Sequence, residues 1–314
     1  MKVLVAGASS EFGLPLLEAL RSAGHEVCGL TRSRRGAEKI GRCGVNSVIA
    51  DVFDREGVGM AVASAEPEAV ISLLITLPKN GPLRPSQVHP NLRLWGEGVP
   101  NLLFAAERAG AHRFLAESFV FAYGYGQYGP EPLTEDDEPA NGAVIRGQAE
   151  ILQGLRAMEH TVLSAKGVEG VVLRYGGRHG AEMPMTATLA RALRLGVPVL
   201  PGGGHALLPF IEVGDSARAT VAALERGGGR EIYNLVDDRP SEMREYAEAL
   251  ASAIGARRPR SLPLPLVKLF APYMACVLDH TRLPVSNEKA KRALDWEPRY
   301  SSPADAVRAY WTHG

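Results

Sequence analysis

The residues with the clearest chemical meaning form a glycine turn near the amino end. Gly7 and Gly13 frame Ser9-Ser10-Glu11-Phe12, directly after the apolar run 3–6, and Ser10 stands where a middle glycine is usual. Glycines at this spacing let backbone amides approach a diphosphate at the start of a helix. We therefore predict a dinucleotide-diphosphate site made of Gly7, Ser9, Ser10, Glu11, Phe12 and Gly13. The alternative is an ordinary strand-to-helix turn.

A basic cluster follows the second apolar run, 26–30. Thr31-Arg32-Ser33-Arg34-Arg35 contains no acid, whereas a site for NAD is expected to carry Asp or Glu here to bind the ribose hydroxyls. Guanidinium groups bind phosphate through two parallel hydrogen bonds. Arg32, Ser33 and Arg35 are therefore predicted to bind the 2′-phosphate of NADP, with NAD as the less favoured cofactor. The alternative is a solvated basic loop.

Asp51 and Val52 follow the third apolar run, 47–50. The pair stands at the end of the third expected strand, and we predict that it contacts the adenine of the cofactor. Asp51 is also well placed to cap a turn or a helix, which is the alternative interpretation.

Composition bounds the function class. The chain has 314 residues, 46% of them hydrophobic, and its 35 basic residues balance its 35 acidic residues, so no nucleic-acid or membrane partner is expected. Three cysteines without a pattern predict neither a disulfide framework nor a metal site. The amino end lacks a basic segment followed by a long apolar one. We expect a cytoplasmic protein with a small-molecule substrate.

Apolar runs alternate with helical patterns along the first half of the chain. The expected strands are 3–6, 26–30, 47–50, 69–74, 113–116 and 170–173, and the expected helices are 14–23, 58–65, 99–109 and 148–160. This alternation predicts an α/β fold, a Rossmann-type doubly wound parallel sheet with a smaller carboxyl-terminal substrate lobe. We assign 1–173 and a returning segment, 211–236, to the cofactor-binding domain, and 174–210 and 237–314 to the lobe.

Several motifs, in order, resemble the extended short-chain dehydrogenases, the NAD-dependent epimerase/dehydratase family. The turn from Gly7 to Gly13 is similar to that family's Gly-Ala-Thr-Gly-Phe-Ile-Gly turn. Further matches are Asn-Leu-Leu-Phe-Ala-Ala at 101–106, Leu-Arg-Tyr-Gly-Gly-Arg-His-Gly at 173–180, Phe-Ile-Glu-Val-Gly-Asp-Ser-Ala-Arg-Ala at 210–219 and the signature at 286–298. The resemblance implies a Rossmann fold, an NAD(P) cofactor and a possible homodimer.

The catalytic positions implied by the resemblance depart from the family. The family places Ser or Thr five residues before the glycine of its Tyr-Gly pair, where this chain has Phe119. Aligning Glu150 with the family's helix glutamate puts Gly142 at the catalytic tyrosine and Arg146 at the lysine. No tyrosine in the chain has a lysine four residues later. Arg146 retains the capacity to donate to the nicotinamide ribose, but the usual proton relay is missing.

Other groups are therefore candidates for chemistry. The resemblance places Tyr175 and His179 after the strand that approaches the nicotinamide, and Ser118 lies beside the lost hydroxyl position. Histidine titrates nearest neutral pH. For Tyr175 and His179 the alternative is packing between the lobes, and for Ser118 it is a hydrogen bond to the backbone.

Substrate contacts are predicted for Phe119, Tyr123, Tyr125 and His205. Tyr123, Tyr125 and Tyr128 make one loop aromatic, which suits a mobile lid over a flat or apolar substrate, although a packed surface loop has the same composition. His205 follows three glycines and is either directed into the pocket or simply exposed.

The leading interpretation is an atypical NADP-dependent oxidoreductase that reduces a small organic or secondary-metabolite substrate without the Tyr/Lys relay. A cofactor-binding sensor or regulator on the same fold is an alternative, because the missing catalytic residues would then be expected. A redox-neutral isomerase or cyclase that reuses the cleft is the third.

Overall fold

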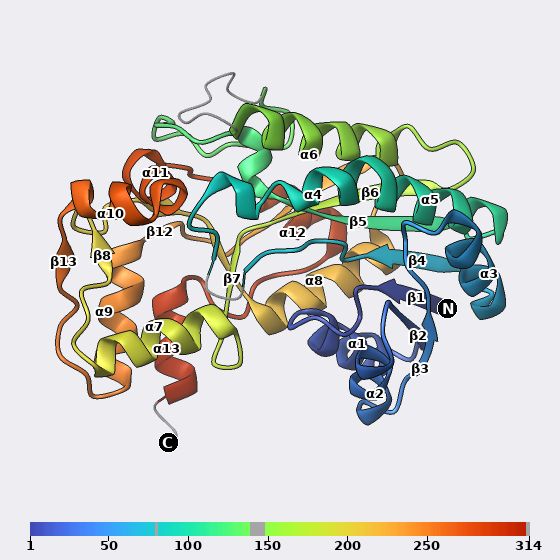
Figure 1. The fold of residues 1–314 in the computed structure, drawn as a ribbon, viewed down its shortest axis with the longest axis horizontal. Coiled ribbons are helices and arrows are strands. Elements are labelled where there is room, and N and C mark those ends of the chain that lie inside the picture. Colours follow the sequence, from blue (N-terminus) through green and yellow to red (C-terminus); the bar gives the residue numbers. More distant parts are fainter. Residues whose placement is uncertain (79–80, 139–147, 312–314) are drawn as a thin grey trace.

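Seven parallel strands form the central sheet of the computed structural model, which describes residues 1–78, 81–138 and 148–311 (Figure 1). The strand order is β11-β6-β5-β4-β1-β2-β3, and every pairing is parallel. The bounds are β1 Lys2–Ala6, β2 Glu26–Thr31, β3 Asn46–Ile49, β4 Ala69–Ser72, β5 Arg113–Phe119, β6 Glu169–Tyr175 and β11 Glu231–Leu235. The order reverses between β1 and β4, which is where such sheets bind ligands.

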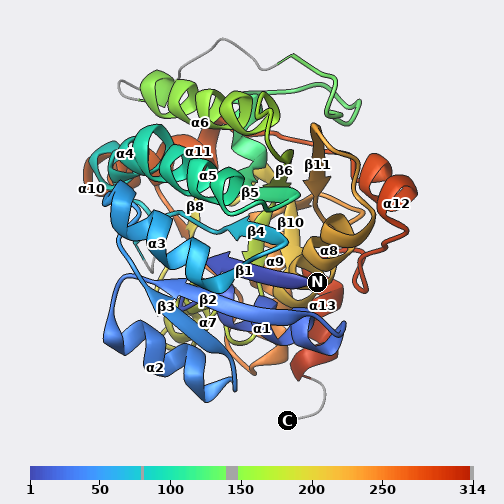
Figure 2. The ribbon, with the colours of Figure 1, turned by 90° about the vertical axis from the view of Figure 1, so that its right-hand side faces the viewer.

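Helices cover both faces of this sheet (Figure 2). One face carries α3 Arg55–Ala65, α4 Pro90–Arg93, α5 Val99–Arg108 and α6 Gln148–Leu163, with short 3-10 or π turns at Pro85–Gln87, Leu94–Gly98 and Val120–Tyr123. The other carries α1 Gly13–Ser22, α2 Arg34–Arg42 and α8 Val213–Arg226. Alternate residues of β1 enter the two cores, Leu4 with the α5 side and Val5 with the α1 side. Burying such a side chain contributes about 1.5–3 kcal/mol, which holds the layers together.

A smaller lobe lies beside the carboxyl edge of the sheet, at the left of Figure 1. It contains α7 Pro184–Arg194, α9 Met243–Ala253, α10 Leu264–Phe270, α11 Pro272–His280 and α13 Pro303–Trp311. Three strand pairs connect its segments: β7 Gly177–His179 with β10 Phe210–Glu212, β9 Leu207–Leu208 with β12 Ser241–Glu242, and β8 Leu200–Pro201 with β13 Ser261–Leu262. The last helix before α13 is α12 Glu288–Leu294, which packs on α8 and β11 rather than on the other lobe helices.

The predicted fold class is confirmed, and the six expected strands are present with shifted ends. β4 ends at Ser72 rather than at 74, and β5 continues to Phe119 rather than ending at 116. Among the sheet strands and the helices that cover them, α2, α4, α8 and β11 were not predicted, although α8 and β11 lie in the segment expected to return to the sheet. The individual elements of the lobe were not predicted either. None of the helices in the described ranges is long and apolar enough to cross a membrane.

Candidate functional site

The turn after β1 has room only for glycine at its two ends. Gly7 has φ of +80°, and a Cβ there would lie 2.6 Å from the Leu73 carbonyl oxygen. A Cβ on Gly13 would lie 2.5 Å from the Ala8 carbonyl oxygen. Both clashes are with backbone, so a side chain at either position would push the turn away from the sheet edge. This close packing leaves the start of α1 open to an anion, as a dinucleotide diphosphate requires.

Ser10 takes part in this turn through its hydroxyl. Its amide donates to the Gly7 carbonyl at 3.0 Å, and its Oγ accepts a hydrogen bond from the Gly13 amide at 2.9 Å. The serine hydroxyl therefore satisfies the amide of Gly13, the first residue of α1, which a glycine at position 10 could not do. Ser9 Oγ lies 3.2 Å from Thr31 Oγ1 and ties the turn to β2, while the Glu11 side chain is exposed. The turn fits a cofactor diphosphate with one amide already capped.

The basic cluster beyond β2 begins a helix rather than a loop. Ser33 is the N-cap of α2, and its Oγ accepts a hydrogen bond from the Gly36 amide at 3.1 Å. Arg34 and Arg35 occupy the first turn of α2, which holds no acidic residue. Cations are disfavoured at this end of a helix, whereas a phosphate there is favoured by the helix dipole and by the arginines. In the described part of the chain no partner engages the exposed guanidinium groups of Arg32, Arg34 and Arg35.

Asp51 and Val52 lie at the same edge, after β3. Asp51 is exposed, and its Oδ1 accepts a hydrogen bond from the Phe53 amide at 3.0 Å. The Val52 carbonyl accepts one from Asn101 Nδ2 at 2.9 Å. Asp51 thus caps a turn, which was the alternative interpretation of its sequence position. Its second carboxylate oxygen, Oδ2, can still accept a hydrogen bond from a ligand.

Ser118 belongs to a buried polar cluster on the α6 side of the sheet. Its Oγ donates to Glu159 Oε1 at 2.6 Å, and Arg174 holds both oxygens of that carboxylate, from Nε at 2.9 Å and from Nη2 at 2.7 Å. The side chains of Arg174 and Glu159 are 6% and 5% exposed. Burial lowers the pKa of Arg174, but the carboxylate more than reverses this, and the pKa is raised. Ser118 is therefore engaged in holding β5, β6 and α6 together.

Phe119 ends β5 and is only partly buried. It presents a ring where the family resemblance expects a hydroxyl, so it can pack against a ligand but cannot donate a proton. Gly142 and Arg146, the other two positions of the altered relay, lie outside the described residues.

Sequence reasoning missed an ion pair between Glu117 and Arg178. Arg178 Nη2 donates to Glu117 Oε1, and its guanidinium lies 4.3 Å from the ring centroid of Phe12 and 4.7 Å from that of Tyr175. An acid inside the buried run 113–119, and an arginine directly after two glycines, were the only signals. The cluster joins the ends of β5 and β6 to the start of α1.

Tyr175 lies within that cluster and is fully buried. Its ring meets Phe12 edge-on at 5.4 Å, and its hydroxyl is 2.6 Å from Thr220 Oγ1 in α8. Burial raises the pKa of this hydroxyl well above its ordinary value. These contacts favour the packing role that was the alternative for Tyr175.

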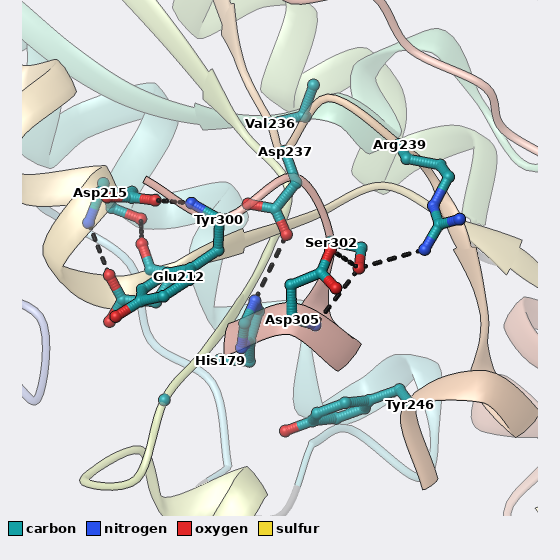
Figure 3. A network of polar contacts seen from close by, with 12 residues as sticks. His179, Glu212, Asp215, Val236, Asp237, Arg239, Tyr246, Tyr300, Ser302 and Asp305 are labelled. Atoms are coloured by element: carbon teal, nitrogen blue, oxygen red, sulfur yellow. Dashed lines mark hydrogen bonds and ion pairs between the residues drawn. The ribbon is translucent and has the colours of Figure 1, made fainter. Parts of the chain in front are cut away.

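His179 faces a buried aspartate at the seam between the lobes (Figure 3). Its Nε2 lies 3.4 Å from Asp237 Oδ2, and both residues are 2% exposed. Burial raises the pKa of Asp237, and the hydrogen bond from His179 opposes that rise. The rings of Phe210 and Tyr246 enclose the imidazole at 6.2 and 5.6 Å. His179 thus fills the seam, and its contacts are those of a packed polar pair.

The aromatic loop after β5 is held by its own hydroxyls. Tyr123 Oη donates to the Thr134 carbonyl at 2.7 Å and meets Asn234, while Tyr125 Oη lies 2.5 Å from Tyr273 Oη of α11. Tyr128 Oη donates to the Tyr123 carbonyl. Tyr123 and Tyr125 are buried, and burial raises the pKa of Tyr123 to about 12. The loop is packed, as in the second interpretation of its sequence, and not shaped as a free lid.

His205 lies apart from the turn, in the second lobe. It borders a cavity of about 270 Å³ together with Gln127, Glu242, Thr281 and Arg282. Its side chain is 68% exposed, and its Nδ1 lies 3.3 Å from Glu242 Oε2. Within the described residues, His205 has no hydrogen bond or ion pair with the groups at the ends of β5 and β6.

Known proteins resemble this chain over nearly its whole length. Residues 3–235 match the profile of the NAD dependent epimerase/dehydratase family. The chain is 35% identical over 310 residues to 3-diazoavenalumate denitrifying reductase of a Streptomyces species, covering 98% of this chain and 99% of that one. It is 27% identical over 320 residues to UDP-glucose 4-epimerase of Mycolicibacterium smegmatis, covering 95% and 94%. The UDP-glucose 4-epimerase of Thermus thermophilus, solved with NAD, superposes with a TM-score of 0.77 at 25% identity, covering 100% and 98%.

Proposed function

Because the chain belongs to the NAD-dependent epimerase/dehydratase family, we propose that it is an NADP-dependent reductase whose substrate accepts hydride without a proton from tyrosine. The observation that carries this proposal is the altered relay. No tyrosine in the chain has a lysine four residues later, and Phe119 stands at the hydroxyl position. An enzyme that interconverts ketones and alcohols needs such a group, because the oxygen gains a proton when the ketone is reduced and loses one when the alcohol is oxidised.

An aromatic diazo compound, in its diazonium form, is a substrate that needs no such donor. The name of the relative at 35% identity describes a reductase that acts on a diazo compound and removes nitrogen. In the reaction that we propose, the cofactor supplies a hydride, the carbon–hydrogen bond forms, the carbon–nitrogen bond breaks, and dinitrogen leaves with the bonding pair. No oxygen changes its protonation, so Phe119 replaces the hydroxyl without loss of a step.

The residues of this chain then bind and orient. The start of α1 binds the diphosphate, and Arg32 and Arg35 bind the 2′-phosphate. Phe119 packs against a flat substrate and excludes water from it. Ser118 holds β5 in place through its hydrogen bond to Glu159.

Cofactor preference is tested by measuring the dissociation constants of NADPH and NADH by calorimetry. Wild-type protein should bind NADPH more tightly, and Arg32→Ala should weaken NADPH by about tenfold or more while leaving NADH unchanged, since a hydrogen bond to a charged group contributes about 1.5–3 kcal/mol. Arg42→Ala, in the last turn of α2, is the matched control and should change neither constant. Equal wild-type constants for the two cofactors would refute the NADP preference.

The reaction is tested with an arenediazonium salt and NADPH deuterated at the transferring carbon. We expect oxidation of the cofactor in step with release of dinitrogen, and deuterium on the carbon that carried the diazo group. Cofactor binding without any substrate-dependent oxidation would refute a reductase and favour a sensor or regulator. Turnover without net oxidation of the cofactor would favour a redox-neutral isomerase or cyclase.

A further inference from the structure

Glu117 and Arg178 form a buried ion pair that has no role in the proposed reaction. Their side chains are 3% and 12% exposed, and Arg178 Nη2 donates to Glu117 Oε1. The rings of Phe12 and Tyr175 flank the guanidinium at 4.3 and 4.7 Å. Removing ions from water is costly, so a pair this buried needs a compensating benefit in folding or in function.

The pair lies beside the nicotinamide half of the proposed cofactor site. The diphosphate position is the start of α1, and the groups predicted to bind the adenosine half, Arg32 and Asp51, follow β2 and β3. The other half must extend in the opposite direction, over the ends of β4, β5 and β6. Glu117 is in β5 and Arg178 is in β7, the short strand after β6. The Phe12 ring connects them to the diphosphate turn.

The two redox states of the cofactor differ in charge at this half. The oxidised nicotinamide ring is a cation and the reduced ring is neutral. An unpaired carboxylate nearby would favour the oxidised form, and an unpaired guanidinium would favour the reduced form. A unit charge about 8 Å away, at an effective dielectric constant of about 20, changes a binding constant about 30-fold.

Building on the proposed function, we infer that Glu117 and Arg178 are positioning residues that keep the nicotinamide half of the site electrically neutral. Each cancels the charge of the other, so the site discriminates little between oxidised and reduced cofactor. The oxidised product cofactor is then held no more tightly than the reduced cofactor that must replace it. The two residues act through the field that they create and touch neither reacting atom.

The test measures the dissociation constants of NADP⁺ and NADPH by calorimetry, in the absence of substrate. The ratio of the NADP⁺ constant to the NADPH constant should rise about tenfold or more in Glu117→Gln, which leaves the guanidinium unpaired. It should fall by a similar factor in Arg178→Gln, which leaves the carboxylate unpaired. The double variant Glu117→Gln/Arg178→Gln should return to within about threefold of the wild-type ratio, because no net charge remains.

Two controls separate charge from folding. Arg178→Lys keeps the charge and should keep the wild-type ratio, and a ratio shifted as in Arg178→Gln would overturn the inference. Adenosine 2′-phosphate 5′-diphosphoribose lacks the nicotinamide, so every folded variant should bind it as wild type does.

The outcomes distinguish the two proposals. A ratio that stays constant, or that moves in the same direction in both single variants, overturns the inference while cofactor binding by wild type still supports the proposed function. Wild-type protein that binds neither NADP⁺ nor NADPH overturns the proposed function itself. If a single variant fails to fold, the remaining single variant, which should shift the ratio, and Arg178→Lys, which should not, still decide the inference.

Discussion

Removing the carboxylate of Glu159 should destabilise the protein far more than its place in a surface helix suggests. Glu159 accepts three hydrogen bonds, one from Ser118 and two from Arg174, and its side chain is 5% exposed. Glu159→Leu would leave the Arg174 guanidinium, itself 6% exposed, without its counter-ion. That guanidinium lies 4.7 Å from the Tyr123 ring, so the cluster also supports the aromatic loop.

The size of the effect follows from the loss of the pair. Breaking a buried ion pair by removing one partner costs about 3–5 kcal/mol, because the remaining charge is uncompensated. Replacing both partners by apolar residues is often nearly neutral. The double variant Glu159→Leu/Arg174→Met should therefore recover at least half of the loss seen in Glu159→Leu. Ser118 loses its acceptor in both variants, which costs about 1 kcal/mol and keeps the recovery incomplete.

Urea unfolding of Glu159→Leu, Arg174→Met and the double variant, followed by circular dichroism, measures these differences in the free energy of unfolding. The exposed pair of Arg93 and Glu97 supplies the control, since Glu97→Gln should leave the unfolding midpoint unchanged. A loss below about 1 kcal/mol in Glu159→Leu would refute the reasoning, because it would mean that Arg174 keeps its charge satisfied without the carboxylate. Additive losses in the double variant would do the same.

Two further predictions concern the turn and the seam. Gly7→Ala should lower the free energy of unfolding by more than the ~1–2 kcal/mol that a left-handed backbone alone costs, and it should abolish cofactor binding. Gly24 also has a positive φ, +84°, but has open space around its Cβ. Gly24→Ala should therefore cost only the backbone contribution and leave cofactor binding intact. Equal losses in urea unfolding would contradict the close approach to Leu73. Burial raises the pKa of Asp237, so its native carboxyl keeps its proton at pH values where the unfolded one has lost it. Its contribution to stability is therefore greatest below its unfolded pKa of about 3.9 and is lost as pH rises through the raised value. As pH rises from about 3.9 through the raised native pKa, Asp237→Asn should therefore gain stability relative to wild type. Melting temperatures of the two proteins measured in parallel across this pH range test this. A difference that does not vary with pH would show that burial does not raise the pKa of Asp237.

The strands could be predicted because they are short runs of Val, Ile and Leu bounded by turn residues. Gly7 and Gly13 were found by their spacing, and the backbone clashes at both positions explain that spacing. Helix α2 escaped the same reasoning, because its only buried residues are Gly36 and Ile40 and its surface is charged. Its one local signal was Ser33, which caps the helix through the Gly36 amide.

Side-chain roles at the strand ends were harder to predict, because they depend on distant partners. Ser118, Tyr175 and His179 all lie near the carboxyl edge of the sheet: Ser118 and Tyr175 are at the ends of β5 and β6, and His179 is in β7. Their hydrogen-bond partners are Glu159, Thr220 and Asp237, which are 41, 45 and 58 residues away along the chain. No local pattern encodes such pairs. The Glu117–Arg178 pair, separated by 61 residues, was missed for the same reason, because its two local signals do not show that the residues meet.

The seam in Figure 3 has a mechanical consequence for motion of the lobe relative to the sheet. Asp215 of α8 accepts hydrogen bonds from the backbone amides of Arg299 and Tyr300, and the Arg239 amide donates to the Ser301 carbonyl at 2.9 Å. The Asp215 bonds join the last segment of the chain to α8, and the Arg239 bond joins that segment to the loop after β11. Moving the lobe away from α8 would therefore break the two Asp215 hydrogen bonds together. A hinge motion of the lobe must therefore either break these two bonds or carry α8 with it.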